Sequence, residues 1–599
     1  MSAVNARGQF GPLLQDDGTT FRLWAPGAQR VDVVLDTPRT MTRENDGWYR
    51  LHCPGIGADT HYRFRIDGEL DVPDPGSDFQ PEDISGPSRI VDHGAYHWRA
   101  EGWRGRPWHD AVVIETHVGT FTPDGTYRAM IDRLDHLVET GITALELMPL
   151  ADFPGRWNWG YDGVLWYAPD STYGTPDDLK TLVDEAHLRG LMVLLDVVYN
   201  HFGPEGNYLG RYAPQFFSQA ETPWGSAIDY SVPQVRAFAI ENALHWLRDY
   251  RFDGLRLDAV HSIVEPGAAQ MLRELSRAAG ELAALTSRHI HLVLENDDNR
   301  AAVLDSSIDP PDGRYRAQWN DDYHHAWHAL LTGEHHGYYA DYADKPLQHV
   351  VRALSSGFAY QGEPSPHRDG QARGEPSGNL PPAAFVNFLQ NHDQTGNRPL
   401  GERLDALASP AAVEAALAVL LLAPMPPMLF MGEEWGSRVP FLFFCDFGGD
   451  LADAVRNGRR REFRHAYEMY GEGIPDPLDA QTFRRAKLDW LTCQSRTGKA
   501  RLGYVRELLA IRAEKIRPHL DELTFGSANA EDSGLVSASW THRRGSDLLL
   551  YANLSNQPAM ARPKLGHTMI WGNAKDAAKA ASTVTPMAPW EVVWAFGPA

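Results

Sequence analysis

Short apolar runs alternate with amphipathic segments along the middle of this chain, from Ala111 onward. The apolar runs are short enough for strands and continuous enough to be buried on both faces, which is typical of a parallel sheet covered by helices. Seven runs are clear: AVVIETHVG (111–119), TALELMPL (143–150), LMVLLDVV (191–198), FDGLRLDAV (252–260), HIHLVLEN (289–296), AFVNFLQNH (384–392) and PMLFMGEE (427–434). We expect an eighth, weaker strand near Gln318 to His325.

The segments between these runs carry helix signals. Thr175, Pro176 and Asp178 resemble a capping box with proline at the first helical position, and Gly190 provides a C-terminal stop. Another helical face is predicted from Met130, Leu134, Leu137 and Val138, ending before Gly141. Eight strands with intervening helices over about 400 residues fit a closed (β/α)8 TIM barrel with long inserts better than an open sheet.

Both ends of the chain show the alternation of β-strands instead. FRLWAPGAQRVDVVL (21–35) and HYRFRIDG (61–68) predict an N-terminal β-sandwich, immunoglobulin-like, and LVSASWTHR (535–543) predicts a C-terminal antiparallel β-domain. The expected domains of this multidomain α/β chain are therefore a sandwich (1–92), a linker (93–110), a catalytic barrel (111–515, with an insert at about 327–380) and a β-domain (516–599). The sandwich either caps the barrel or binds a ligand of its own.

Composition narrows the function classes. The 599 residues are 43% hydrophobic, enough for a large core, and their net charge of -23 disfavours binding to nucleic acid or anionic membranes. Cys53, Cys445 and Cys493 form no CxxC motif, so no disulfide framework is expected. The first residues lack the apolar stretch of a secretory signal. Prolines interrupt the most apolar run, Ala415 to Met431, so we expect it to be a core helix followed by a strand and not a membrane span. We expect a cytoplasmic protein.

Acidic residues end four of the predicted strands. Asp196 closes LMVLLD, Asp258 closes GLRLD, Glu295 closes HLVLE, and Asp393 follows FVNFLQNH. The carboxyl ends of barrel strands form the mouth of the active site, so these acids should converge there. The period of two places Arg256 on the face of Asp258, where its charge would keep that carboxylate ionised.

Such a constellation suits glycoside hydrolysis. That reaction needs one carboxylate as nucleophile and one carboxylic acid as proton donor, on opposite sides of an acetal carbon. We interpret Asp258 as the nucleophile and Glu295 as the acid, whose pKa an apolar surround and an acidic neighbour would raise. Asp393 would stabilise positive charge in the transition state.

Four blocks resemble the α-amylase family, glycoside hydrolase family 13: DVVYNH (196–201), GLRLDAVH (254–261), LVLEN (292–296) and FLQNHD (388–393). The resemblance implies the same three catalytic roles, with Arg256, His392 and His201 around the attacked glucose and Tyr161 as a sugar-stacking tyrosine. Relatives often hold calcium near the residue equivalent to Asn200. We see no dedicated cage of oxygen ligands, so we expect no metal and no cofactor.

Further blocks are most similar to the trehalohydrolase branch of that family: ETHVGTFTPDGTY (115–127), NHFGPEGNYL (200–209), NDDYHH (320–325), NHDQTGNRPLGERL (391–404) and TFRRAKLDW (482–490). The resemblance implies cleavage of the α-1,4 bond that joins a maltooligosaccharide to a terminal trehalose, with metabolic coupling to maltooligosyltrehalose synthase. It also implies substrate contacts along three segments. With the residues above, the expected binding residues are Tyr161, Asp196, His201, Arg256, Leu257, Ala259, Val260, His261, Asp321, Asp322, Tyr323, His324, His325, His392, Gln394, Thr395, Gly396 and Asn397.

Two departures and three alternatives accompany this interpretation. Glu295 is followed by NDDNR, where a shorter acidic–Arg–Asn sequence is expected, and the last strand leads into MGEEW instead of a glutamine-containing form.

The alternatives are a glucan branching or debranching enzyme of the same family and a glucan-binding protein with a decayed active site. A metal-dependent hydrolase is less favoured, because the side chains of the adjacent pairs His324-His325 and His335-His336 would point to opposite faces of a strand, and HExxH is absent.

Overall fold

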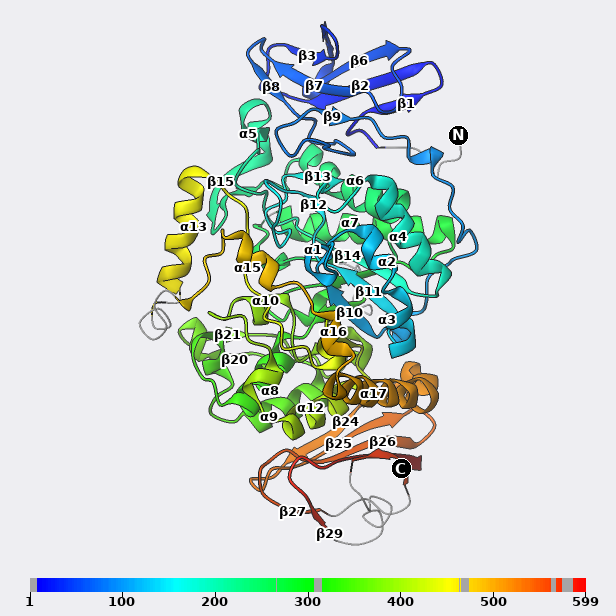
Figure 1. Cartoon of the computed structure of the whole chain (residues 1–599), viewed down its shortest axis with the longest axis vertical. Coiled ribbons are helices and arrows are strands. Elements are labelled where there is room, and N and C mark those ends of the chain that lie inside the picture. The colour runs from blue at the N-terminus through cyan, green and yellow to red at the C-terminus, as the bar shows by residue number, and fades with distance from the viewer. Residues whose placement is uncertain are drawn as a thin grey trace.

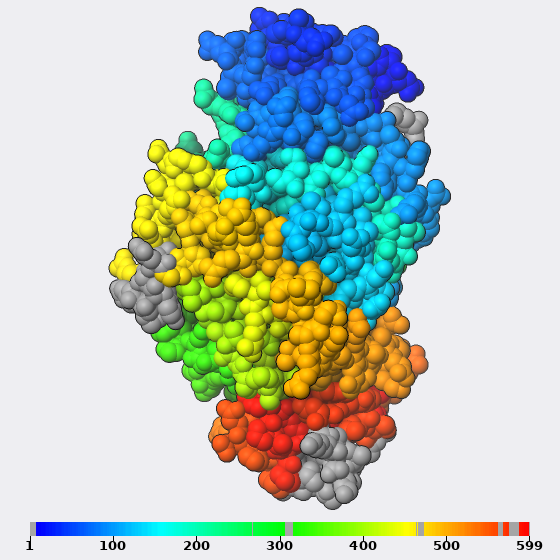
Figure 2. Space-filling model, in the orientation of Figure 1, coloured from blue at the N-terminus to red at the C-terminus, as the bar shows by residue number. Residues whose placement is uncertain are grey.

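The computed structural model describes residues 8–265, 267–305, 315–462, 464, 473–561, 567–573 and 585–598. A central barrel carries one β-rich unit at each end, the N-terminal unit at the top of Figure 1 and the C-terminal unit at the bottom. The space-filling view shows both units packed directly against the barrel (Figure 2). Residues 1–7, part of the segment that argued against a secretory signal, lie outside the described residues.

Eight parallel strands close into the barrel, in the order in which they occur in the sequence. All seven clear strand predictions are confirmed, and the weaker eighth strand lies at Ala317–Trp319. The strands are β10 (Val113–Thr116), β11 (Ala144–Leu147), β14 (Met192–Val197), β17 (Gly254–Leu257), β18 (His291–Leu294), β19 (Ala317–Trp319), β22 (Phe385–Phe388) and β23 (Pro427–Phe430). β23 returns to pair with β10, so the barrel has no free edge.

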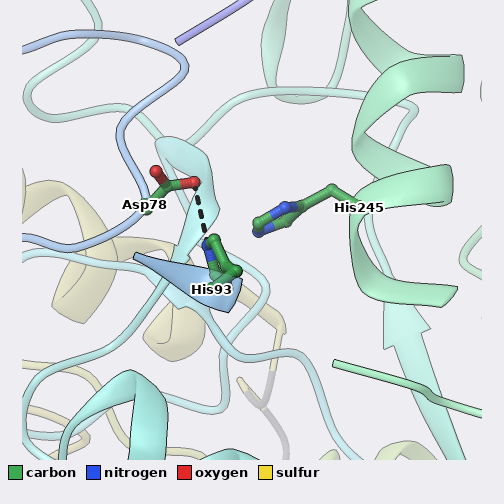
Figure 3. Close-up of side chains that lie close together, drawn as sticks. All are labelled: Asp78, His93 and His245. Carbon is green, nitrogen blue, oxygen red and sulfur yellow. Dashed lines mark ion pairs between the residues drawn. The ribbon is translucent and has the colours of Figure 1, made fainter. Parts of the chain in front are cut away.

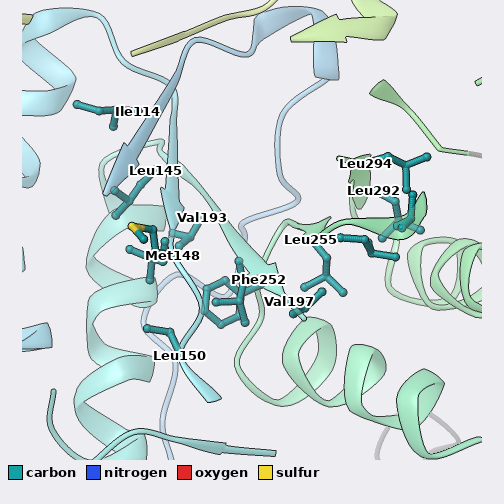
Figure 4. Packing of buried hydrophobic residues seen from close by; sticks show 14 of the residues in the cluster. Ile114, Leu145, Met148, Leu150, Val193, Val197, Phe252, Leu255, Leu292 and Leu294 are labelled. Carbon is teal, nitrogen blue, oxygen red and sulfur yellow. The ribbon is translucent and has the colours of Figure 1, made fainter. Parts of the chain in front are cut away.

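The period of two divides the strand side chains between two cores. One set, which includes Leu255, Leu292 and Leu294, packs against the surrounding helices (Figure 4). The alternate set, which includes Leu194, Val293 and Trp319, fills the barrel interior. Arg256 pairs in register with Val293, so its side chain belongs to the interior set, as the alternation in GLRLD predicted.

Helices cover the barrel between its strands. The Thr175 capping box and the proline start of α4 are confirmed, because the Thr175 side chain accepts from the Asp178 amide. The longer helices are α4 (Pro176–Leu188), α6 (Pro233–Asp249), α7 (Gly267–Thr286), α8 (Asp321–Thr332), α9 (Pro346–Ser356), α12 (Pro410–Leu422), α13 (Gly449–Glu462) and α17 (Arg496–Ile511). The shorter helices are α1 (Val118–Phe121), α2 (Tyr127–Ile131), α3 (Leu134–Thr140), α5 (Leu209–Tyr212), α10 (His392–Gly396), α11 (Leu404–Leu407), α15 (Ala480–Arg485) and α16 (Trp490–Cys493).

The N-terminal unit is the expected sandwich. One sheet contains β1 (Leu13–Gln15), β2 (Gly18–Trp24), β6 (Trp48–Pro54) and β5 (Thr42–Arg43). The other contains β4 (Pro38–Thr40), β3 (Val31–Val34), β7 (His61–Ile66) and β8 (Leu70–Val72), with β9 (Ser88–Arg89) pairing with β7. The predicted domain limits at residues 92, 110 and 515 stay a prediction.

The C-terminal unit is an antiparallel sheet of β24 (Leu523–Ala530), β25 (Leu535–His542), β26 (Ser546–Asn553), β30 (Val592–Pro598) and β28 (Thr568–Gly572). Within the barrel, three short hairpins extend from the loops: β12–β13 (Ala151–Asp152 and Leu165–Pro169), β15–β16 (Phe217–Thr222 and Gly225–Ile228) and β20–β21 (Glu363–Ser365 and Gln371–Arg373). In the described part of the chain, no helix combines the length and the apolar character that crossing a membrane requires.

Two local predictions were wrong. Residues 321–325 do not continue a strand, because α8 begins at Asp321 directly after β19. The expected helix around Met130 to Val138 is two helices, α2 and α3, and Val138 is 39% exposed instead of facing the core. The C-terminal stop at Gly141 is confirmed, since this residue adopts a left-handed conformation with φ of 100°.

Candidate active site

Three carboxylates from neighbouring strands surround one buried guanidinium at the carboxyl end of the barrel. Arg256 Nη1 donates to Asp196 Oδ2 at 2.6 Å and to Asp258 Oδ1 at 2.8 Å. Its Nη2 lies 2.8 Å from Glu295 Oε2. Asp196 lies on β14, and Asp258 and Glu295 directly follow β17 and β18, so these three acids converge as the sequence predicted.

The guanidinium itself is fixed inside the barrel. Arg256 is 1% exposed and its guanidinium carbon lies 4.1 Å from the centre of the Trp319 ring. An arginine that is buried this deeply needs compensating charge, and three carboxylates supply it. Its two terminal nitrogens hold the Asp258 and Glu295 carboxyl groups close together, as two groups acting on one bond must be.

The two principal carboxyl groups differ in their surroundings. Asp258 accepts hydrogen bonds from Arg256 Nη1 at 2.8 Å and from Asn200 Nδ2 at 2.7 Å. Burial raises the pKa of Glu295, an increase that Arg256 opposes and the Asp258 carboxylate reinforces. Acid-assisted displacement requires one carboxyl group that attacks and another that donates a proton. The hydrogen-bond donors around Asp258 suit the first role, and the raised pKa of Glu295 suits the second.

Asp393 lies on α10, at the end of the loop that follows β22. Its Oδ1 accepts from Asn397 Nδ2 at 2.6 Å. Burial raises the pKa of Asp393, while the neighbouring His392 opposes that increase. Arg459 of α13 donates to Asn397 Oδ1 at 2.8 Å, so a residue distant in the sequence fixes the amide that orients this carboxyl group.

His392 is held by a residue that the sequence analysis did not select. Glu115, at the end of β10, accepts from the His392 backbone amide at 2.9 Å and contacts its Nδ1. Burial alone would lower the pKa of His392, but the charge and hydrogen bond of Glu115 outweigh it and raise that pKa. The rule that selected Asp196 would also have selected Glu115, which ends the apolar run VVIE.

Tyr161 and His201 line the side of the site next to Asp196. The Tyr161 hydroxyl donates to Asp196 Oδ2 at 2.5 Å, and its ring stacks on His392 with centroids 4.9 Å apart. His201 Nε2 lies 2.9 Å from the Tyr161 carbonyl oxygen, and its ring stacks on the half-exposed Trp224 with centroids 4.6 Å apart. Asn200, considered only as a calcium neighbour, instead donates to the Asp258 side chain.

A cavity of about 210 Å³ opens beside these groups. Six of the predicted site residues line it: His261, Glu295, Asp321, His325, Asp393 and Gln394. Burial raises the pKa of Asp321 well above its usual value, and the carboxylates of Glu295 and Asp297 reinforce this increase. A site that is rich in polar groups, yet partly enclosed, suits a hydroxylated, uncharged ligand.

The other predicted binding residues lie behind this surface. Asp322 is fully buried and binds Arg373 at 2.8 Å and the backbone amides of Ala359 and Tyr360. His324 Nδ1 contacts the Leu389 carbonyl oxygen at 2.7 Å. Tyr323, Leu257, Val260, Thr395 and Gly396 are buried as well, and the Ala259 amide donates to Glu295 Oε2 at 2.8 Å. These positions support the site rather than line the cavity.

One wall of the cavity comes from residues that sequence reasoning missed. Arg368 and Arg373, on and beside the β20–β21 hairpin, bind Asp297 at 2.5 and 2.8 Å. Asp297 belongs to the unusual NDDNR segment after Glu295. The hairpin lies more than 60 residues beyond Glu295 in the sequence, and no local pattern could show that its arginines would meet Asp297.

Comparisons with known proteins agree with this architecture. Family models match residues 92–215 as "Alpha amylase, catalytic domain", residues 9–80 as "Carbohydrate-binding module 48 (Isoamylase N-terminal domain)" and residues 524–594 as a domain of unknown function. The chain is similar to the crystal structure of a candidate alpha amylase from Salmonella typhimurium, with a TM-score of 0.92 and 44% identity over 98% of this chain and 99% of that one.

Two curated relatives give the family. The malto-oligosyltrehalose trehalohydrolase of Deinococcus radiodurans is 41% identical over 93% of this chain and 91% of its own length. That of Arthrobacter ramosus is also 41% identical, over 82% of this chain and 87% of its own length. With a closed eight-stranded barrel and acidic residues gathered at its carboxyl end, the chain belongs to the malto-oligosyltrehalose trehalohydrolases, glycoside hydrolases of the α-amylase family.

Proposed function

We propose that this enzyme hydrolyses the α-1,4 bond next to the terminal trehalose of maltooligosyltrehalose and releases free trehalose. Asp258 is the nucleophile, Glu295 the acid and base, and Asp393 the group that stabilises the transition state. The observation that carries this proposal is the contact of Arg256 with both Asp258 and Glu295, which holds the two carboxyl groups beside one reacting carbon.

In the first step, an Asp258 oxygen bonds to the anomeric carbon as the bond from that carbon to the glycosidic oxygen breaks. Glu295 transfers its proton to this oxygen, which leaves with trehalose. In the second step, Glu295 takes a proton from water, the water oxygen bonds to the anomeric carbon, and the bond to Asp258 breaks. Two inversions retain the α configuration, and the carboxyl separation should be about 5–5.5 Å.

The surrounding residues support a glucose subsite at this position. Tyr161 presents an aromatic ring, while His201, Arg256, His392 and Asp196 provide polar groups around it. The cavity residues His261, Asp321, His325 and Gln394 lie on the Glu295 side, where the leaving trehalose would be bound. The proposed reaction uses only carboxyl groups and water, so it requires neither a cofactor nor a metal ion.

The same proposal extends to the cellular setting. Its substrate carries trehalose at the reducing end of a glucan, so the enzyme acts after a synthase that forms maltooligosyltrehalose. Cys53, Cys445 and Cys493 are all free and buried, which suits a reducing compartment such as the cytoplasm.

The deciding experiment incubates the enzyme with maltooligosyltrehalose and, separately, with a maltooligosaccharide of equal length. Chromatography then identifies the sugars released. Trehalose from the first substrate, at a much higher rate than any product from the second, supports the proposal. Formation or cleavage of α-1,6 bonds as the main activity would instead indicate a branching or debranching enzyme.

A further inference from the structure

A cluster of metal-binding side chains lies away from the catalytic carboxylates, where the N-terminal unit meets the barrel. Asp78 lies between β8 and β9 of the sandwich, His93 in a short 3-10 helix (His93–Ala95), and His245 on α6 of the barrel. One potential ligand atom from each lies within 4.8 Å of the others. Figure 3 shows Asp78 and the two imidazole rings gathered around a common point.

His93 has no hydrogen bond that accounts for its position. Both of its ring nitrogens are buried, and neither has a hydrogen-bond partner among the described residues. Asp78 Oδ1 lies 3.3 Å from its Nε2, and Asp78 is fully buried. A buried polar group without a hydrogen bond costs about 1–3 kcal/mol, and a metal ion coordinated by the imidazole would offset this cost.

His245 shows the support that metal-binding histidines usually have. Its Nδ1 lies 2.9 Å from Asp249 Oδ2, and a carboxylate on one ring nitrogen commonly directs the other nitrogen toward a metal ion. Arg248 binds the same carboxylate at 2.8 Å. His245 Nε2 lies 3.0 Å from the Tyr167 carbonyl oxygen.

A neutral His245 ring cannot donate hydrogen bonds to both of its neighbours. Asp249 and the Tyr167 carbonyl are both acceptors, and a neutral imidazole has only one N–H to donate. With Nδ1–H donated to Asp249, Nε2 keeps a lone pair that can coordinate a metal ion.

We propose that Asp78, His93 and His245 bind a divalent transition-metal ion, with zinc as the expected occupant. Two imidazoles and one carboxylate form a ligand set that suits zinc and not calcium or magnesium. Zinc ligands lie about 2.0–2.2 Å from the ion, so the three side chains must draw together slightly.

The ion would join two units of the chain. Asp78 and His93 precede the barrel, whereas His245 is part of its second long helix, so bound zinc would fasten the N-terminal unit to α6. The role is structural, because no member of this cluster lines the catalytic cavity. Zinc binding should therefore change the stability of this junction and leave hydrolysis at low temperature unchanged.

The test uses the full-length enzyme, stripped with a chelator and then dialysed with or without Zn²⁺. The proposal expects about one Zn²⁺ retained per chain by elemental analysis, and a rise of about 2 °C or more in the first unfolding transition. His93→Gln should lose both effects. His97→Gln is the matched control, because His97 is exposed in the same segment four residues later.

Three results would overturn the proposal. They are a wild-type chain that retains no zinc and shows no thermal shift, equal zinc retention by His93→Gln, and an equal thermal shift with Ca²⁺. If His93→Gln fails to fold, Co²⁺ reconstitution of the wild type provides a second measurement. Visible absorption typical of four-coordinate Co²⁺ with nitrogen ligands supports the site, and its absence contradicts it.

Discussion

Glu115 and His392 are linked twice, once through the backbone amide of His392 and once through its imidazole. The amide contact is 2.9 Å long and Glu115 is 1% exposed, so this pair is isolated from solvent. His392 in turn stacks on Tyr161 and adjoins Asp393. Glu115 thus reaches the catalytic groups through His392 without touching the substrate itself, which makes it a positioning residue.

Glu115→Gln should reduce kcat/KM by about 10- to 100-fold, which corresponds to the loss of a buried hydrogen bond to a charged group. The pH profile provides the specific readout. Glu115 raises the pKa of His392, so the charged imidazole is favoured below that pKa and is lost as the pH rises through it. The basic limb of the profile should therefore move to lower pH in Glu115→Gln.

Glu139→Gln is the control for that measurement, because Glu139 is a 68% exposed residue of α3 whose ion pair with Arg506 is at the surface. Its rate and pH profile should match those of the wild type. An unchanged basic limb in Glu115→Gln would show that Glu115 does not set the charge of His392.

Asp258→Asn should reduce kcat by at least about 10³-fold, while glucan binding measured by calorimetry stays close to that of the wild type. The amide keeps the size of the side chain and still accepts from Arg256, but it cannot bond to the anomeric carbon. Wild-type turnover in this variant would refute the assignment of the nucleophile.

Glu295→Gln should show a different dependence on the leaving group. Its rate with maltooligosyltrehalose should fall by about 10²–10⁴-fold because protonation of the departing oxygen is lost. An aryl α-glycoside whose phenol leaves without protonation should recover much of the first step, which a burst of released phenol reports. No difference between the two substrates would contradict the role of Glu295 as proton donor.

Asp321 and Asp322 are neighbours in the sequence with opposite expected roles. Asp322 is fully buried and binds Arg373 and two backbone amides, so Asp322→Ala should destabilise the fold by about 3–5 kcal/mol, measured by denaturant unfolding. Asp321 lines the cavity, so Asp321→Asn should alter kcat/KM with little change in stability. The reverse pattern would show that the first turn of α8 is oriented differently.

The barrel was predictable because its signals are local. Each strand is a short apolar run, and a catalytic acid follows the last apolar residue of LVL or GLRL, so strand ends and candidate residues appear together in the sequence. Glu115 was missed although it obeys the same rule. Residues 321–325 were misjudged because β19 has only three residues and α8 begins after a single intervening position.

The remaining features depend on contacts between distant segments. The arginines that bind Asp297 come from the β20–β21 hairpin, and Arg459, which fixes Asn397, comes from α13. Neither the hydrophobic period nor the motif spacing predicts which loops contact one another at the carboxyl end of the barrel. The cluster of Asp78, His93 and His245 was hidden for the same reason, since its members lie up to 167 positions apart.

The anomeric form of the first product distinguishes double displacement by Asp258 and Glu295 from a single displacement by water. Proton NMR during the first moments of maltooligosyltrehalose hydrolysis resolves the α and β anomers of the new reducing end before they equilibrate. Double displacement predicts that the α anomer appears first, together with trehalose. Initial formation of the β anomer would contradict it, because a single displacement by water inverts the anomeric carbon.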